Sequence, residues 1–316
     1  MTTGSKADQA GNLARAHSDE IVEIHERILG ATAARSRYLE LGAGRRVHLI
    51  EAGEGPPLVS LHGSSTSSLS LVPLLEHLVG LRVIAVDRPG FGLSEPVQVP
   101  REHFRDAAIE FVDEVLDRLE LETCALTGQS MGGTWAVWYA LARPARVRRL
   151  ALLGSVPLLP GTRPPAPLRV MVTPVVGDLL SRVKPNPKMV VRLMSSMGEQ
   201  ETIVRYPDLI EALAAAGRDP IASAANLAEL RAILSPLGFR RSARLHTYEL
   251  RRLTAPTLLI WGDHDPVGPV EVAQATAGAI PDAQLEVLSA GHVPHLGHPE
   301  RVSELLSGFV RSGSDV

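Results

Sequence analysis

Cysteine is almost absent from the sequence: Cys124 is the only one among 316 residues. A single cysteine excludes an intrachain disulfide framework and a metal site built from several cysteines. Because Cys124 lies in the apolar stretch TCALT, we expect a buried thiol with no part in chemistry.

The sequence also lacks a strong net charge and a long hydrophobic run. Its formal net charge is −3. No overall field attracts the chain to nucleic acid or to an anionic membrane, and we expect neither as a partner. No run approaches the roughly 18 apolar residues of a membrane span, and the N-terminal stretch has acidic residues and no signal-peptide core. These absences predict a cytoplasmic protein.

What is present is an alternation of short apolar stretches and amphipathic helical patterns. A hairpin is predicted over residues 37–53. Buried strands are predicted within the ranges 57–63, 81–87, 123–128, 147–155, 255–266 and 283–292. Helices are predicted at 70–78, 104–120, 130–144 and 299–310. Continuous apolar strands that alternate with such helices predict an α/β fold, with a mostly parallel sheet covered on both faces.

An N-terminal extension, residues 1–37, precedes this alternation. Residues 1 to about 12 are expected to be disordered. From Leu13 to Leu29 the apolar positions recur near helical spacing, which predicts an amphipathic helix. This helix would pack on the rest of the chain or on a partner subunit, so a homo-oligomer is left open.

A second interruption divides the alternating pattern. Six prolines lie between Pro157 and Pro174, and only short helical stretches, without a convincing strand, follow as far as Leu250. We therefore expect a core formed by residues 38–155 and 251–316, with a helical cap inserted over 156–250. Four of the six methionines fall in this cap: Met171, Met189, Met194 and Met197. They would either fill the interior of the cap or line an adaptable apolar pocket.

The stretch LTGQSMGGTW places Ser130 between a predicted strand and a predicted helix. A G-x-S-x-G match alone has little specificity in a chain rich in glycine and serine, but this context is the one the motif requires. The tight turn strains the serine backbone and needs small neighbours, here Gly128 and Gly132. The helix N-terminus that follows offers free N–H groups to an oxyanion.

A serine needs a base and an orienting acid, and both follow in the order Ser…Asp…His. Asp265 lies in WGDHDP after one predicted strand, and His292 lies in SAGHVPH after the next. Asp263, two residues from Asp265, is an alternative acid. The other position where an acid sometimes occurs, after the strand at 147–155, has Ser155 and no carboxylate.

Together these motifs resemble the α/β-hydrolase superfamily over about Tyr38 to Val310. GQSMGG resembles its nucleophile elbow, LHGSS its oxyanion loop and VDRPGFGLS a turn common among its members. WGDHDP and GHVPHLGHPE resemble its acid and histidine motifs. The resemblance implies an eight-stranded, mostly parallel sheet with a helical cap.

The resemblance also implies a role for each site residue. Ser130 would be the nucleophile, His292 the base and Asp265 the orienting acid. The backbone N–H groups of Ser64 and Met131 would form the oxyanion hole. The expected substrate-binding residues are Ser65, Met171, Met194, Met197 and Val293. No metal or organic cofactor is expected, because the histidines near His292 form no closed set of metal ligands.

The function expected from these residues is hydrolysis of a carboxylic ester through an acyl-enzyme. The substrate would be a small molecule with an apolar portion. Carbon–carbon bond hydrolases, lactonases and amidases with the same triad remain alternatives, as does a receptor of this fold without turnover. Val293 departs from many carbon–carbon hydrolases, which have tryptophan after the histidine.

Overall fold

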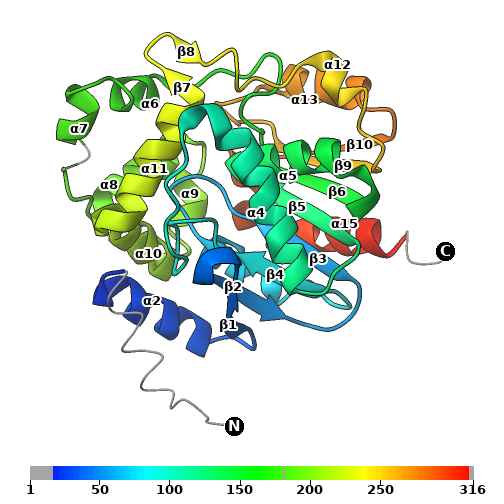
Figure 1. Ribbon diagram of the computed structural model, residues 1–316, viewed down its shortest axis with the longest axis horizontal. Helices are drawn as coiled ribbons and strands as arrows, with labels where there is room; N and C mark the ends of the chain where they lie inside the picture. Colours follow the sequence, from blue (N-terminus) through cyan, green and yellow to red (C-terminus); the bar gives the residue numbers. More distant parts are fainter. Residues whose placement is uncertain (1–16, 181, 313–316) are drawn as a thin grey trace.

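A computed structural model describes residues 17–180 and 182–312. At its centre is one eight-stranded sheet (Figure 1). In spatial order its strands are β1 Arg35–Glu40, β2 Arg46–Ala52, β4 Arg82–Val86, β3 Pro57–Leu61, β5 Cys124–Gln129, β6 Val147–Leu153, β9 Thr257–Gly262 and β10 Ala283–Leu288. β2 pairs antiparallel with both of its neighbours, and the other pairs are parallel. The predicted α/β-hydrolase fold with a mostly parallel sheet is confirmed.

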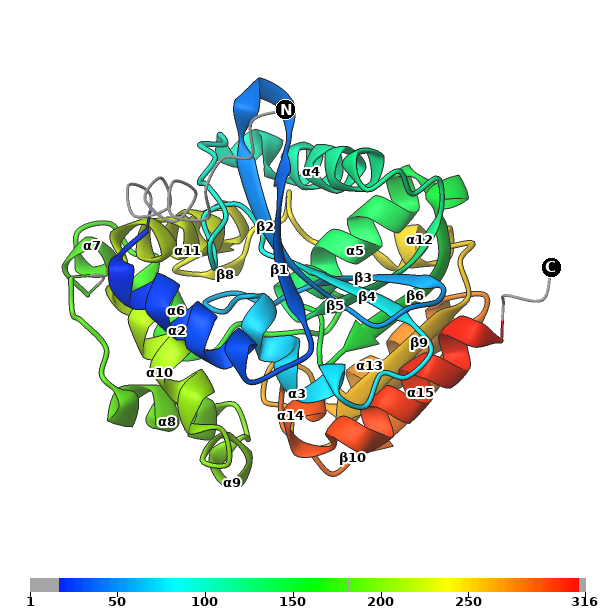
Figure 2. The ribbon, with the colours of Figure 1, turned by 90° about the horizontal axis from the view of Figure 1, so that it is seen from below.

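Helices cover both faces of the sheet (Figure 2). One face is covered by α4 Phe104–Arg118, α5 Met131–Ala142 and α13 Val270–Ala279. The other is covered by α3 Val72–Leu75 and α15 Pro299–Arg311, with α14 Pro294–Gly297 just before α15. The inner strands β4, β3, β5 and β9 are mostly apolar because both of their faces are buried, whereas the edge strands β1 and β10 are partly exposed and carry polar residues. Cys124 is fully buried, and burial raises the pKa of its thiol to about 12.

The segment between β6 and β9 is mainly helical. It contains α6 Ala166–Met171, α7 Val176–Leu180, α8 Pro187–Ser196, α9 Gln200–Ile203, α10 Pro207–Arg218, α11 Pro220–Ile233 and α12 Thr247–Leu250. We call residues 156–250 the cap segment. The division of the chain at these boundaries stays a prediction.

The expectation that the cap segment has no strand is wrong at one place. β7 Leu234–Ser235 and β8 Gly238–Phe239 form a small antiparallel hairpin. Each strand has two residues, which is too short for the two-residue alternation that marks a strand in a sequence.

The first described helix, α2 Asp19–Gly30, packs against α10 of the cap segment (Figure 2). Its apolar face buries Ile21, Ile24 and Ile28. The sequence predicts that this helix begins at Leu13 and that residues 1–12 are disordered. Both predictions lie outside the described residues. No helix of the described part of the chain is long and apolar enough to cross a membrane.

Candidate active site

Ser130 occupies a strained turn between the end of β5 and the start of α5. Its backbone has φ 51° and ψ −117°, outside the regions that non-glycine residues ordinarily adopt. A Cβ atom at Gly132 would overlap the carbonyl oxygen of Leu61, and one at Gly128 would overlap the backbone of Gly132. The two glycines are therefore required for β5 and α5 to meet at this angle, which places Ser130 beyond the end of the strand.

A chain of hydrogen bonds leads from Ser130 to a buried carboxylate. Ser130 Oγ lies 2.8 Å from His292 Nε2, and His292 Nδ1 lies 2.9 Å from Asp265 Oδ2. Asp265 follows β9 and His292 follows β10, so neighbouring parallel strands end where these side chains meet. The structure thus brings together all three residues predicted as a triad. Asp263, the alternative acid, instead accepts a hydrogen bond from the Ala290 backbone and does not contact His292.

Asp265 is held in its ionised form. Burial raises the pKa of its carboxyl, but the charge of His292 and three hydrogen bonds outweigh burial and leave the pKa below its usual value. Besides the bond with His292, the backbone N–H groups of Ser155 and Val267 donate to Asp265, at 2.8 and 2.9 Å. An anchored carboxylate of this kind fixes the tautomer of the imidazole it contacts.

Ser155 is a second serine beside His292, which sequence reasoning noted only for its lack of a carboxylate. Its Oγ lies 3.1 Å from His292 Nδ1, the nitrogen that faces Asp265. Ser155 is fully buried and does not line the cavity described below, whereas Ser130 does. Of the two serines, only Ser130 is in reach of a molecule in that cavity.

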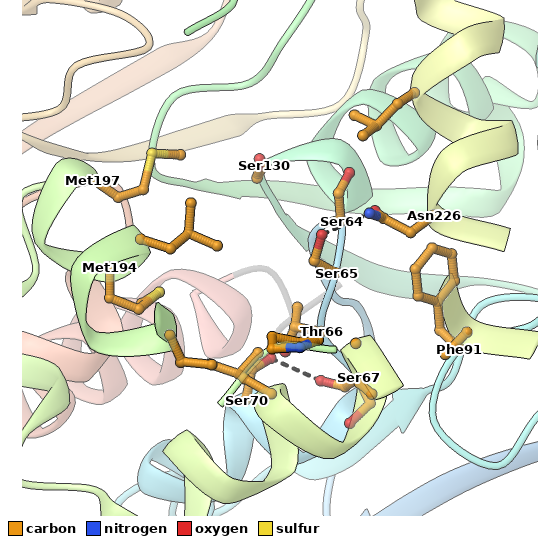
Figure 3. A pocket seen from close by; sticks show the side chains of 18 of the residues that line it. Ser64, Ser65, Thr66, Ser67, Ser70, Phe91, Ser130, Met194, Met197 and Asn226 are labelled. Atoms are coloured by element: carbon orange, nitrogen blue, oxygen red, sulfur yellow. Dashed lines mark hydrogen bonds between the residues drawn. The ribbon is translucent and has the colours of Figure 1, made fainter. Parts of the chain in front are cut away.

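The loop after β3 presents backbone N–H groups next to Ser130. Among the described residues, neither the Ser64 nor the Met131 N–H has a hydrogen-bond acceptor. The hydroxyl of Ser64 donates to Glu229 Oε1 at 2.6 Å, and that of Ser65 donates to Asn226 Oδ1 at 2.9 Å (Figure 3). Both acceptors belong to α11, so the hydroxyl groups of Ser64 and Ser65 link the loop to the cap segment. The backbone N–H groups of Ser64 and Met131 remain available to an oxyanion.

Arg88 fixes the same loop from below. It is fully buried, donates to the carbonyl oxygens of His62 and Gly63 at 2.9 Å, and forms an ion pair with Glu229 of α11. Burial lowers the pKa of His62 to about 3, so its neutral ring accepts a hydrogen bond from the Arg88 N–H. Sequence reasoning did not identify Glu229, because no local pattern marks an acid on a cap helix as the partner of a distant arginine.

Glu199, between α8 and α9, touches the loop that carries His292. Its Oε1 accepts the N–H of Val293 at 2.7 Å, and the N–H of His292 donates to the Met197 carbonyl at 2.9 Å. Glu199 is fully buried, and burial raises the pKa of its carboxyl despite the opposing effect of that hydrogen bond. Glu199 was also missed from the sequence, where it follows no recognised motif.

A cavity of about 730 Å³ opens above Ser130, between the core and the cap segment. Five residues predicted to bind substrate line it: Ser65, Met171, Met194, Met197 and Val293. Met194 and Met197 lie across the cavity from Asn226 and Phe91 (Figure 3). Its described lining contains no Asp, Glu, Lys or Arg. Burial lowers the pKa of the lining residue His25 to about 4, which keeps that side chain neutral near pH 7.

Comparison with known proteins agrees with this geometry. The model of the family described as alpha/beta hydrolase fold matches residues 56–299, more than half of the chain. A 2-hydroxy-6-oxononadienedioate/2-hydroxy-6-oxononatrienedioate hydrolase from Paraburkholderia phymatum is 30% identical over 296 residues, covering 88% of this chain and 96% of that protein. A pimeloyl-[acyl-carrier protein] methyl ester esterase from Shewanella oneidensis is 29% identical, covering 85% of this chain and 96% of that protein.

Among solved structures, a carboxylesterase from Bacillus subtilis superposes with a TM-score of 0.73. It is 21% identical, and the match covers 92% of this chain and 97% of the other. At 21% identity this superposition shows a shared fold. Membership of the family is shown by the match to the family model and by the relative that is 30% identical. The chain belongs to the α/β-hydrolase fold family and is a hydrolase of that fold.

Proposed function

We propose that this protein hydrolyses carboxylic esters through an acyl-enzyme formed on Ser130. The observation that carries the proposal is the Ser130–His292–Asp265 hydrogen-bond chain, which opens into an apolar cavity. Ser130 Oγ attacks the ester carbonyl carbon while His292 Nε2 takes its proton, and the developing oxyanion accepts the N–H groups of Ser64 and Met131.

The remaining steps use the same residues. His292 returns the proton to the departing alkoxide, which leaves as an alcohol, and the acyl group stays on Ser130. A water molecule then attacks the acyl carbon as His292 removes its proton. The carboxylic acid departs when Ser130 regains a proton from His292. Asp265 stabilises the imidazolium in both halves of the reaction and does not itself take up a proton.

The chemistry of the cavity supports a neutral ester over a carbon–carbon bond substrate. The name of the relative from Paraburkholderia phymatum describes a substrate with two carboxylates. The described lining of this cavity offers no cationic side chain, and burying a carboxylate without a partner is costly. Carbon–carbon hydrolysis is kept as the second candidate because that relative is 30% identical over most of both chains.

The test is hydrolysis of p-nitrophenyl esters from acetate to palmitate by the wild type and by Ser130→Ala. We expect the variant to lose roughly four to six orders of magnitude in kcat, since the triad acts as a unit. Ser196→Ala is the matched control, because it alters an exposed serine of α8 that does not line the cavity. Equal, slow turnover by wild type and Ser130→Ala on every ester would rule out the esterase. A 2-hydroxy-6-oxo dienoate would then be the next substrate to measure.

A further inference from the structure

The outer surface of the cap segment carries a concentration of exposed hydrophobic side chains. Of the fourteen exposed large hydrophobic residues in the described part of the chain, eight lie between Val170 and Leu193, on α6, α7, α8 and their links. Their exposed fractions range from 41% to 77%. Single exposed hydrophobic residues are ordinary, but a contiguous group of this kind is typical of an interaction site.

These eight residues, which we call the apolar rim, lie on the part of the cap segment that forms one side of the cavity. Five of them also line the cavity: Val170, Leu180, Val183, Met189 and Leu193. The other three, Val175, Val176 and Leu179, do not line the cavity; they are exposed on α7 or just before it, the helix that ends with the lining residue Leu180. Figure 1 places α6, α7 and α8 on the side of the cap segment away from the sheet. The cavity therefore meets solvent through an apolar opening.

Basic side chains are interspersed with the apolar rim. Residues 163–193 contain six basic residues and one acid, although the whole chain has a net charge of −3. Arg182, Lys184, Lys188 and Arg192 are exposed, and none of the four forms an ion pair with a described carboxylate. The pKa of Glu20 of α2 is lowered first by its hydrogen bond with Arg218, with which the carboxylate is paired, and also by the charge of Lys184. The single acid, Asp178, pairs with Arg231 of α11. The surface near the opening of the cavity therefore combines exposed apolar side chains with an excess of positive charge.

We propose that the apolar rim docks on an anionic lipid surface, from which amphiphilic ester substrates enter the cavity. Such a surface matches both properties, because its boundary layer accepts apolar side chains and its phosphate groups attract nearby lysines and arginines. A two-fold contact with a second copy would bring like charges together, which opposes that arrangement. The entry of substrate from lipid rests on the proposed esterase function, whereas the docking does not.

Docking is measured by sedimentation of the Ser130→Ala variant with lipid vesicles, so that turnover plays no part. One vesicle is phosphatidylcholine alone, and the other contains about one third phosphatidylglycerol. We expect partitioning into the anionic vesicle to be at least about tenfold stronger and to weaken as salt is added.

Two double variants separate the contributions of charge and apolar surface. Lys184→Glu with Lys188→Glu should lower binding to the anionic vesicle about tenfold or more. Val176→Ser with Leu179→Ser should lower binding to both vesicles, because it removes apolar area only.

The matched control is Arg251→Glu with Arg252→Glu, two exposed arginines just after α12, which lies far from α7 (Figure 1). The control should bind like its parent. None of these residues lines the cavity, and the far-UV circular dichroism and the urea midpoint of each variant, compared with those of Ser130→Ala alone, check that it is folded.

Several results would overturn the docking proposal. The first is absence of sedimentation with either vesicle, which would make the rim an entrance for dissolved substrates only. The second is an equal loss of binding in the control. The third is a dimer in light scattering that Val176→Ser with Leu179→Ser dissociates, which would assign the rim to contact between copies. Vesicle binding without any ester hydrolysis would refute the proposed function and leave the docking intact.

Discussion

At the residue scale, substitutions of Glu199 distinguish the effect of its negative charge on His292 from the effect of its hydrogen bond with Val293. Glu199→Gln keeps an oxygen for the N–H of Val293 but removes a negative charge that favours the imidazolium of His292. We expect kcat/KM on p-nitrophenyl butyrate to fall about tenfold, which corresponds to about 1.4 kcal/mol. The free energy of unfolding should not fall, because a buried neutral amide is desolvated at less cost than a carboxylate.

Glu199→Ala is the comparison for that prediction. It also removes the acceptor of the Val293 N–H, so we expect a further loss of about 2 kcal/mol in the free energy of unfolding, measured by urea titration. A Glu199→Gln variant with undiminished kcat/KM would mean that Glu199 supports the loop only through its hydrogen bond.

The sequence could predict some of these residues and not others. Ser130 directly follows β5, and Asp265 and His292 lie in the loops just after β9 and β10. Each belongs to a short motif, so the local sequence predicts both its place and its order. Glu199 and Glu229 meet their partners 94 and 165 residues away in the chain. Only the packing of the cap segment on the core creates those contacts, and no local pattern encodes them.

At the scale of elements, one carboxylate joins the starts of two helices. Asp219 is the N-cap of α11, where its Oδ1 accepts the N–H groups of Ile221 and Ala222, and its Oδ2 accepts the N–H of Ser18 before α2. Asp219→Ala should lower the free energy of unfolding by about 2–3 kcal/mol. Asp219→Asn should lose less, because asparagine is an equally good N-cap. Urea titration of both variants checks this, and equal losses would contradict it.

The attachment of α2 should also depend on pH through His17 and Asp219, whose side chains are 3.3 Å apart and buried. Burial lowers the pKa of His17, but its hydrogen bond and attraction to Asp219 outweigh burial and leave the pKa raised. Burial likewise opposes ionisation of Asp219, yet its hydrogen bonds, first that from His17, lower its pKa to about 2. The stabilisation from His17 is therefore complete below its unfolded pKa of about 6.5 and is lost as the pH rises through its raised folded pKa.

That dependence is measured as the difference in free energy of unfolding between the wild type and His17→Gln. The difference should decline from pH 6 towards pH 9, and it should also decline below about pH 4 as Asp219 becomes protonated. A difference that stays constant from pH 6 to pH 9 would mean that His17 is not charged in the folded protein. Taking the difference between the two proteins cancels the titration of groups that do not interact with His17.

Helices and strands could be predicted where burial gives many consecutive residues a recognisable hydrophobic pattern. The strands of the core are apolar runs, and α2 has apolar positions at helical spacing, so both could be expected from the sequence. β7 and β8 could not, because two paired residues on each side of Pro236 and Leu237 give no period. The side of the molecule on which α2 lies depends on Asp219 and on ion pairs with α10 such as Arg218–Glu20, which only the folded chain reveals.

At the scale of the whole molecule, the cap segment is bound to the core through buried polar contacts that surround the cavity. Glu199 meets the loop that carries His292, and Glu229 meets both Arg88 and the loop that carries Ser64. The net charge of the whole chain predicted no attraction to anionic surfaces. That sum hides the local excess of basic residues near the mouth of the cavity, because acidic residues elsewhere in the chain offset it. Fold class follows from composition and period, whereas local charge and cavity shape require the packed structure.

The Arg88–Glu229 ion pair tests whether this binding of cap to core also sets the oxyanion hole. Both side chains are almost completely buried, so Glu229→Ala leaves a guanidinium without its counter-ion and should lower the free energy of unfolding by about 3–5 kcal/mol. Calorimetry and urea titration measure this loss, and an unchanged free energy of unfolding would contradict it. Replacing both residues, as Arg88→Met with Glu229→Leu, should recover part of the stability, because it removes the unpaired buried charge but leaves the carbonyl groups of His62 and Gly63 and the hydroxyl of Ser64 without these partners. The double variant should not recover kcat, since Arg88 also holds the carbonyl groups of His62 and Gly63 just before Ser64. A gain in stability over Glu229→Ala without a gain in kcat would assign the pair to positioning of the oxyanion loop, whereas a gain in both would reduce it to a structural contact.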